Sequence, residues 1–348
     1  MYIHELNAWP GFTWDKLVVL EKLVVVRQKQ GYLVGKMEGM GFNLKSAAHL
    51  DVLISDVSKS SEIEGEHLDL DQVRSSIARK LGMDISGLVP SDKGVDGVVE
   101  MMLDATQHCE AKLTQRRLFN WQASLFPTGR SGMFKITVGQ WRVNATSDPM
   151  QVVSGAIGRE KIHFEAPTSE KVPVEMKSFL NWLNSQTTHD EIIKAAIAHL
   201  WFVTIHPFSD GNGRIARAIT DMLLARADGT IQRFYSMSKE IRNQRKKYYE
   251  VLESTQKGNL DITSWLMWFL NCLEKAIETS EETLKTSLNK AAFWERHATT
   301  PFNERQAKLV NQLFDGFIGK LTSSKWAKIC KCSQDTAGRD INDLLKKG

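Results

Sequence analysis

Apolar residues recur at spacings of three and four over most of the chain, which is the pattern of helices that bury one side. Within residues 14–37, Leu17, Leu20 and Val24 follow this spacing, and Gly31 is a weak point of the predicted helix. Further segments with the same periodicity are 45–68, 70–83 and 98–114. The pattern therefore predicts a mainly α-helical protein.

The middle of the chain departs from this pattern. Residues 126–174 combine prolines and glycines with short β-branched runs, and 148–167 predict one small hairpin with its turn near Gly158. Residues 208–300 contain no proline at all, so a run of helices is expected there. The composition changes again at 301–348, which predicts a separate small helical unit.

Composition narrows the class of protein only a little. The chain has 348 residues, a net charge of +4 and 25% charged residues, a balance that does not by itself indicate nucleic-acid binding. Its four cysteines form no C-x-x-C pair, which argues against a zinc site or a disulfide framework and favours a reducing, cytoplasmic location. The first residues do not resemble a signal peptide, and no apolar run is long enough to cross a membrane.

One short segment, "HPFSDGNGRIAR" at 206–217, places dense polar chemistry between two apolar segments. Gly211 and Gly213 leave the backbone uncovered just before a helical pattern, and N–H groups at a helix N-terminus bind phosphate well. Arg214 and Arg217 lie three residues apart, so both guanidinium groups project from one side of that helix toward such an anion.

The same segment carries two further candidates for chemistry. Asp210 beside a phosphate loop suits Mg²⁺, which usually takes one carboxylate together with substrate phosphates and water. His206 is suited to act as a general base toward an attacking hydroxyl. A lone glycine turn or a lone histidine is usually structural. All these polar groups together require a common partner, because two buried arginines without one are costly. A bound polyphosphate or an internal carboxylate would be such a partner.

The segment matches at every specified position the signature of the Fic family, H-P-F-x-[D/E]-G-N-G-R-x-x-R, and the chain resembles that family over most of its length. The similarity extends to "GVVEMMLDAT", "LFPTGRSG" and "VGQWRV" upstream and to "YYEVLESTQKGNLDITSWLMWFL" downstream. The resemblance implies a helical core with a short β-hairpin flap at 95–290. It also implies an N-terminal helical region at 1–85 and a C-terminal unit like a winged helix-turn-helix at 301–348.

The resemblance implies transfer of AMP from ATP to a Ser, Thr or Tyr hydroxyl of a protein, with release of pyrophosphate. His206 would deprotonate the hydroxyl, and Asp210 would hold Mg²⁺. The phosphates would be held by Gly211, Asn212, Gly213, Arg214 for the β-phosphate and Arg217 for the γ-phosphate.

Two other segments are assigned by the same resemblance. The flap maps onto "MQVVSGAI", where Val153, Ser154 and Gly155 would align a target by strand addition. Tyr248 and Tyr249 match an aromatic pair that lines the adenine pocket, although ordinary helix packing also explains them. The last assigned nucleotide contact, Gln256, falls where some relatives have asparagine.

The segment "SSEIEGEHL" at 60–68 resembles the family's inhibitory motif, [S/T]-x-x-x-E-[G/N], through Ser60, Glu64 and Gly65. Its carboxylate would pair with Arg217 in place of the γ-phosphate, and Gly65 would end the helix. The alternative is a solvated acidic helix end.

The C-terminal residues "SSKWAKICKCSQDTAGRDINDLLKKG" have the length of two helices with a turn at 331–333. Acidic residues on the second helix, Asp335, Asp340 and Asp343, argue against contact with DNA phosphates, so packing or partner docking is favoured over DNA binding.

Competing activities remain open from the sequence. The same site would serve AMP removal, with Glu64 positioning water, or phosphate transfer. Against phosphate transfer, Doc-type kinases carry Ala and Lys where this chain has Gly211 and Arg214. A nucleotide-sensing DNA-binding regulator is the alternative from another class. A protein substrate is implied, self-modification and a homodimer stay open, and no membrane partner is indicated.

Overall fold

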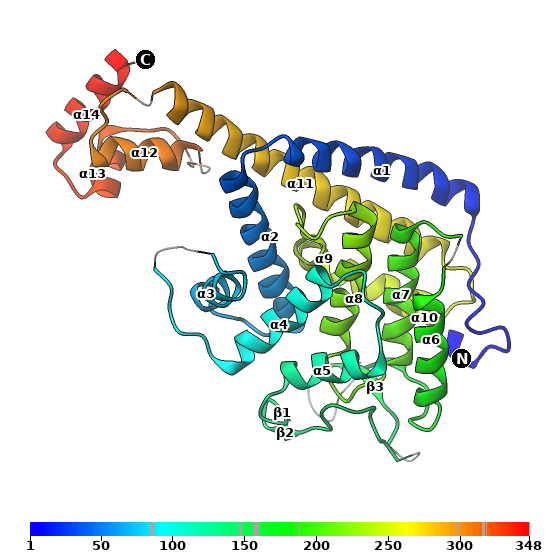
Figure 1. Cartoon of the computed structure of the whole chain (residues 1–348). Helices are drawn as coiled ribbons and strands as arrows, with labels where there is room; N and C mark the ends of the chain where they lie inside the picture. Colours follow the sequence, from blue (N-terminus) through cyan, green and yellow to red (C-terminus); the bar gives the residue numbers. More distant parts are fainter. Residues whose placement is uncertain are drawn as a thin grey trace. The chain divides into compact units, whose positions relative to one another are not determined.

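The computed structural model describes residues 1–348 apart from 84–86, 146–147, 156–158, 160, 187, 298, 315–316, 318 and 348. Its description also leaves out the side chains of 43, 286–288, 291 and 295. The chain forms two compact units, 1–278 and 279–348, which divide within one long helix (Figure 1).

Helices dominate the first unit, as the hydrophobic periodicity predicts. They are η1 Ile3–Glu5, α1 Lys16–Glu38, α2 Phe42–Ile63, α3 Leu70–Lys80, α4 Lys93–Gln107, α5 Gln115–Leu125, α6 Val172–Asn184, α7 Glu191–Ile205, α8 Asn212–Asp228, α9 Met237–Asn243, α10 Arg245–Gln256 and the start of α11 Thr263–Arg296. The predicted helix around Gly31 is confirmed, because α1 continues through this glycine without a break.

The core of the first unit is built around α7, whose residues from Ile192 to Ile205 are all buried. Helix α8 packs against it along most of its length. The two apolar segments that flank the polar motif are therefore the two central helices, and the connection between them holds His206 to Gly211.

Strands are few and short in the described residues. The predicted hairpin is confirmed as β3 Gln151–Ser154 paired antiparallel with β4 Lys161–Glu165, and its predicted turn near Gly158 lies outside the described residues. The expectation of a single hairpin is wrong: β1 Arg130–Ser131 pairs with β2 Phe134–Lys135. Strands of two residues produce no alternating pattern that a sequence could reveal.

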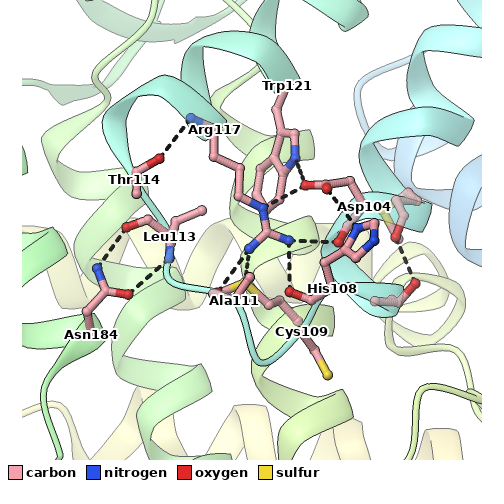
Figure 2. Close-up of polar contacts among 12 residues, drawn as sticks. Asp104, His108, Cys109, Ala111, Leu113, Thr114, Arg117, Trp121 and Asn184 are labelled. Atoms are coloured by element: carbon pink, nitrogen blue, oxygen red, sulfur yellow. Dashed lines mark hydrogen bonds and ion pairs between the residues drawn. The ribbon is translucent and has the colours of Figure 1, made fainter.

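A polar network joins α4 to α5 (Figure 2). The Oδ2 atom of Asp104 accepts hydrogen bonds from Arg117 Nε and Trp121 Nε1, each at 2.6 Å. Arg117 also donates to the backbone oxygens of Asp104 and Ala111 at 2.7 and 3.1 Å. These bonds link the last turn of α4 to the loop that follows it. Arg117 thereby fixes the loop that leads into α5.

The second unit contains the rest of α11 together with α12 Glu304–Phe314, α13 Ser323–Cys330 and α14 Gln334–Lys347. Leu309, Trp326 and Ala337 form its small core. The predicted turn between the last two helices is present, with Lys331 in the left-handed conformation at φ 49°. No helix in the described residues is long and apolar enough to cross a membrane.

Candidate active site

The entry into the motif loop is fixed by backbone bonds around His206. This residue follows the last residue of α7, adopts φ 52° and donates its N–H to the Phe202 carbonyl at 3.0 Å. Its own carbonyl accepts a bond from Arg142 Nε at 2.7 Å, and the Arg142 N–H donates to Pro207 O at 2.9 Å. Arg142 is thus a site residue that the sequence analysis did not single out. Only the quoted segment "VGQWRV" pointed to it.

The imidazole of His206 is neutral at physiological pH. Burial lowers its pKa to about 4, more than neighbouring carboxylates raise it. Nδ1 lies 3.3 Å from the Val203 carbonyl oxygen, so the proton of the neutral ring is assigned to Nδ1. Nε2 then carries the lone pair that a proton acceptor needs.

The loop closes through the side chain of Asn212. Its Oδ1 accepts from the Phe208 N–H at 2.9 Å, and its Nδ2 donates to the Phe208 carbonyl at 2.8 Å. The Asn212 amide therefore closes the loop onto the Phe208 backbone through both of its polar atoms. Gly211 adopts φ 88° at the N-cap of α8, a conformation that favours glycine.

Asp210 lies at the rim of the loop. Its Oδ1 accepts from the Gly211 N–H at 2.6 Å, and its Oδ2 accepts from the Ser131 hydroxyl. No cluster of three His, Cys, Asp or Glu residues that suits a metal occurs in the described part of the chain. A metal at Asp210 would therefore take its other ligands from phosphate and water, which is how proteins commonly hold Mg²⁺.

Arg217 meets the end of α2. It is 1% exposed and donates from Nε to Ser60 Oγ at 2.8 Å and from Nη2 to Glu64 Oε1 at 2.7 Å. Burial acts to raise the pKa of Glu64, but the nearby Arg217 charge outweighs it and leaves that pKa below its usual value. Among the described atoms, Arg217 Nη1 is buried without a hydrogen-bond partner, so Glu64 and Ser60 do not use every N–H of this guanidinium.

Arg214 is held by the same segment. Its Nη1 donates to Glu66 Oε2 at 2.6 Å, and its guanidinium lies 5.0 Å from the centre of the Phe126 ring. A Cβ atom on Gly213 would lie 2.0 Å from Glu64 Oε1, so this glycine makes room for the carboxylate at the N-terminus of α8. Both arginines and the helix N-terminus thus face carboxylates of one segment, and Glu66 is a partner that sequence reasoning missed.

The turn that presents Glu64 follows from the glycine after it. Gly65 adopts φ 89°, its N–H donates to Glu62 O at 3.1 Å, and Glu66 N–H donates to Ser61 O at 3.0 Å. This pair of bonds is the Schellman arrangement that ends many helices. Arg245 Nε adds a bond to the Ile63 carbonyl at 2.6 Å. The end of α2 is therefore held in place from both sides.

The residues expected at the adenine pocket separate into two groups. Tyr248 is buried, and its hydroxyl lies 2.8 Å from Nε2 of the buried His199, which matches the packing alternative. Tyr249 faces the site, with its hydroxyl 3.5 Å from Glu64 Oε2. Gln256 is buried and donates to Thr204 Oγ1 at 3.2 Å.

The flap contains a contact that the sequence analysis did not identify. The register shifts between Val152 and Val153, which leaves His163 as an extra residue on β4. Its Nε2 lies 2.6 Å from Ser154 Oγ, and its Nδ1 lies 2.6 Å from Glu253 Oε2 on α10. Bonds to Lys257 and His163 lower the pKa of Glu253 to about 2. His163 therefore ties both strands of the flap to α10.

The outer side of the flap is accessible. Val153 is 47% exposed, and Gly155 adopts φ 112° just after β3. A separate surface pocket of about 280 Å³ lies among residues of α4 and α5 and is lined by Glu100, Asp104, Asn120 and Trp121 among others. None of the motif residues lines this pocket, so it is distinct from the loop site.

Comparison with known proteins agrees with this geometry. Residues 112–224 match the model of the Fic/DOC family, and residues 2–83 match a domain of unknown function, DUF4172. The chain carries a Fic/DOC-family domain. The matched Fic region includes the motif loop and ends within α8, and the DUF4172 region includes α1 and all of α2 with Glu64.

The chain is similar to curated proteins named protein adenylyltransferase Fic. The protein from Culex quinquefasciatus is 28% identical over 238 residues, which cover 66% of this chain and 42% of that protein. The Drosophila melanogaster protein is 32% identical over 142 residues, which cover 39% of this chain and 27% of that protein. The chain thus spans less than half the length of these relatives.

Solved structures share the fold. A Fic family protein from Desulfovibrio desulfuricans aligns with a TM-score of 0.56 at 20% identity, covering 97% of this chain and 91% of its own. Fic-1 from C. elegans aligns with a TM-score of 0.51 at 23% identity, and the alignment covers 78% of this chain and 75% of the Fic-1 chain. Because the sequence identities are low, this likeness establishes the fold alone.

Proposed function

We propose that the chain is a protein adenylyltransferase that transfers AMP from ATP to a side-chain hydroxyl of a protein. The observation that carries the proposal is one loop that combines the neutral, half-buried His206 with a helix N-terminus and two buried arginines. Relatives named protein adenylyltransferase Fic add support.

The proposed reaction is an in-line displacement at the α-phosphorus of ATP. The target hydroxyl oxygen forms a bond to this phosphorus, while the bond to the oxygen that bridges to the β-phosphate breaks. Pyrophosphate leaves with that electron pair, and the hydroxyl proton moves to His206 Nε2, which is free to accept it. Arg214, Arg217 and the N–H groups at the start of α8 bind the phosphates that leave.

The proposal includes a divalent metal such as Mg²⁺ at Asp210. When bound, Mg²⁺ neutralises phosphate charge and favours departure of pyrophosphate. The single carboxylate of Asp210, already oriented by Gly211 and Ser131, fits the few protein ligands that Mg²⁺ takes in nucleotide sites.

The proposal also includes self-inhibition by the end of α2. In the present arrangement Glu64 occupies Arg217, and Glu66 occupies Arg214. A γ-phosphate that approaches Arg217 would meet a carboxylate at the same guanidinium. ATP would then bind only with its phosphates displaced, which denies the target hydroxyl an in-line approach. Release requires Glu64 to leave this position.

The target polypeptide is proposed to dock along the flap. In the described residues β3 pairs only with β4, so its outer edge can accept an added strand. Strand addition would fix the target backbone and place its hydroxyl near His206.

The test compares ATP labelled on the α-phosphate with ATP labelled on the γ-phosphate. Glu64→Gly protein in a cell lysate is expected to transfer the α-label to proteins, and the same variant with His206→Ala is expected to transfer none. Transfer of the γ-label instead would contradict the proposal and indicate phosphate transfer. Chelation of divalent metals is expected to abolish labelling.

Hydrolytic removal of AMP from a modified target is the second candidate, with water as the nucleophile, since Glu64 at the Arg217 side of the loop could orient a water molecule. Labelled target would be incubated with the unmodified protein and Mg²⁺ or Mn²⁺. If the unmodified protein releases free AMP and the Glu64→Gly variant does not, AMP removal would be assigned to the same site.

A further inference from the structure

Helix α1 has an apolar stripe on the side that faces away from the core. Its inner side is formed by Val19, Leu23, Val26, Gln30, Leu33 and Met37, all buried. On the outer side, Leu17, Leu20 and Val24 are 67%, 54% and 58% exposed. Scattered exposed apolar residues are common, whereas a contiguous patch of this kind marks an interaction surface.

The outer stripe changes character along the helix. After Val24 the same spacing continues through Gln28, Gly31 and Gly35. A Cβ atom built on either glycine would meet nothing within 4 Å. The N-terminal half of the stripe therefore carries projecting apolar side chains, and in the C-terminal half the backbone is uncovered at Gly31 and Gly35.

We propose that this stripe is the contact between two copies of the chain, with the two α1 helices packed antiparallel. A two-fold axis between Arg27 and Gln28 places Leu20 of each copy over Gly35 of the other. The same register places Val24 over Gly31. In this single register, Leu20 and Val24 of each copy both lie over a glycine of the other copy, as a self-complementary two-fold contact requires.

Charges at the edges of the stripe fit this alignment. Lys16 and Glu38 are exposed at opposite ends of α1 on one flank, so the antiparallel pairing brings each lysine near the partner's glutamate. A parallel pairing would instead leave the two glycine halves of the stripe facing each other across a gap.

A membrane surface fits the stripe less well. Helices that lie on membranes carry mainly basic residues beside their apolar face, whereas here Glu21 and Glu38 border it. Helix α1 is fixed within the first unit, because its Lys29 bonds to Glu274 and Glu278 of α11 at 2.7 and 2.5 Å. The outer stripe is therefore presented on a helix that is held in place.

The first test measures association by sedimentation over a range of concentrations. The unmodified chain is expected to form a dimer. Leu20→Glu is expected to weaken that dimer by at least about 100-fold, since two exposed leucines lose their burial at once. Val18→Glu, on the same helix but beside the stripe, is the matched control and should change the dimer little. A monomer at every concentration would overturn the proposal.

The second test fixes the register by disulfide formation. Chains with Val24→Cys mixed with chains carrying Gly31→Cys are expected to cross-link. Val24→Cys chains alone should cross-link no more than the unmodified protein, whose own cysteines provide the background. Val25→Cys mixed with Gly31→Cys is the control for random collision. Efficient cross-linking of Val24→Cys to itself would contradict the antiparallel register.

Discussion

Arg217 is the residue at which the two expected states of the site compete. It is buried and charged, so removal of its anionic partner without replacement costs about 3–5 kcal/mol. Glu64 supplies that partner from a distant part of the chain. A nucleotide phosphate is the natural substitute, because its oxygens suit the guanidinium as a carboxylate does. Each anion therefore displaces the other.

Ser60→Ala tests whether the contacts around Arg217 act together. The variant removes the hydroxyl that accepts from Arg217 Nε, so Glu64 should hold less firmly and AMP transfer should rise severalfold. The matched control is Ser61→Ala, since Ser61 is equally buried and its hydroxyl has no partner among the described atoms. Equal rates for the two variants, measured by labelled AMP incorporation, would contradict a role for Ser60.

Sequence reasoning identified the residues of the loop because they all lie within one short segment, 206–217, whose order of residue types is itself the signal. It could not foresee that the Asn212 amide would be committed to Phe208, nor that Arg142 would fix the His206 carbonyl. It also missed Glu66. Each of these depends on contacts between segments, or on the path of the backbone, which residue spacing does not specify.

At the scale of elements, the end of α2 and the flap are the two parts that the proposed reaction requires to adjust. The predicted end of α2 at Gly65 agrees with the structure, because left-handed backbone favours glycine. The predicted strands of the flap also agree, but the bulge at His163 does not show in the strand pattern. The hairpin of β1 and β2 was missed because its strands are too short for a periodic signal.

His163→Ala tests whether this histidine holds the flap. Loss of its contacts to Ser154 and Glu253 should speed amide hydrogen exchange in β3 and β4. Glu253→Gln should act in the same direction, more weakly. Lys161→Ala, at an exposed position on the same strand, is the control. If amide exchange is unchanged in His163→Ala, the pairing of β3 with β4 is enough by itself to stabilise the flap.

Asp104→Ala tests the joint between α4 and α5. The variant leaves Arg117 and Trp121 without their shared acceptor, so the free energy of unfolding should fall by about 1–3 kcal/mol. Glu100→Ala removes only an exposed pairing with Lys80 at 3.8 Å and should change stability by less than about 1 kcal/mol. The free energies of unfolding of both variants would be measured by urea titration. An equal decrease in the two variants would contradict a stabilising role for the network.

At the scale of the whole molecule, buried histidines link stability to pH. Burial lowers the pKa of His199 to about 3 and that of His206 to about 4, and it also lowers the pKa of His49. The unfolded chain, with ordinary histidine pKa values near 6.5, binds these protons first as the pH falls. Stability from these groups is therefore present above pH 6.5 and is lost in acid.

His199→Gln isolates one of these groups. The variant is expected to be less stable than the unmodified protein at pH 7.5, since His199 bonds Thr220 and Tyr248. Below pH 6.5 the difference should narrow by about 1.4 kcal/mol per pH unit, because glutamine has no proton to bind. Urea unfolding at pH 7.5, 6 and 5 would contradict the account if the difference stayed constant.

The central claim is that Glu64 restrains AMP transfer through Arg217. The most direct measurement is the rate of incorporation of α-labelled AMP by the unmodified protein, by Glu64→Gly and by Glu62→Gln. Glu62 lies in the same turn and pairs with Lys59 at 2.6 Å rather than with Arg217, so its variant should match the unmodified protein. Glu64→Gly should be faster by about 5- to 150-fold, the range of typical coupling energies. Equal rates for all three proteins would contradict the claim.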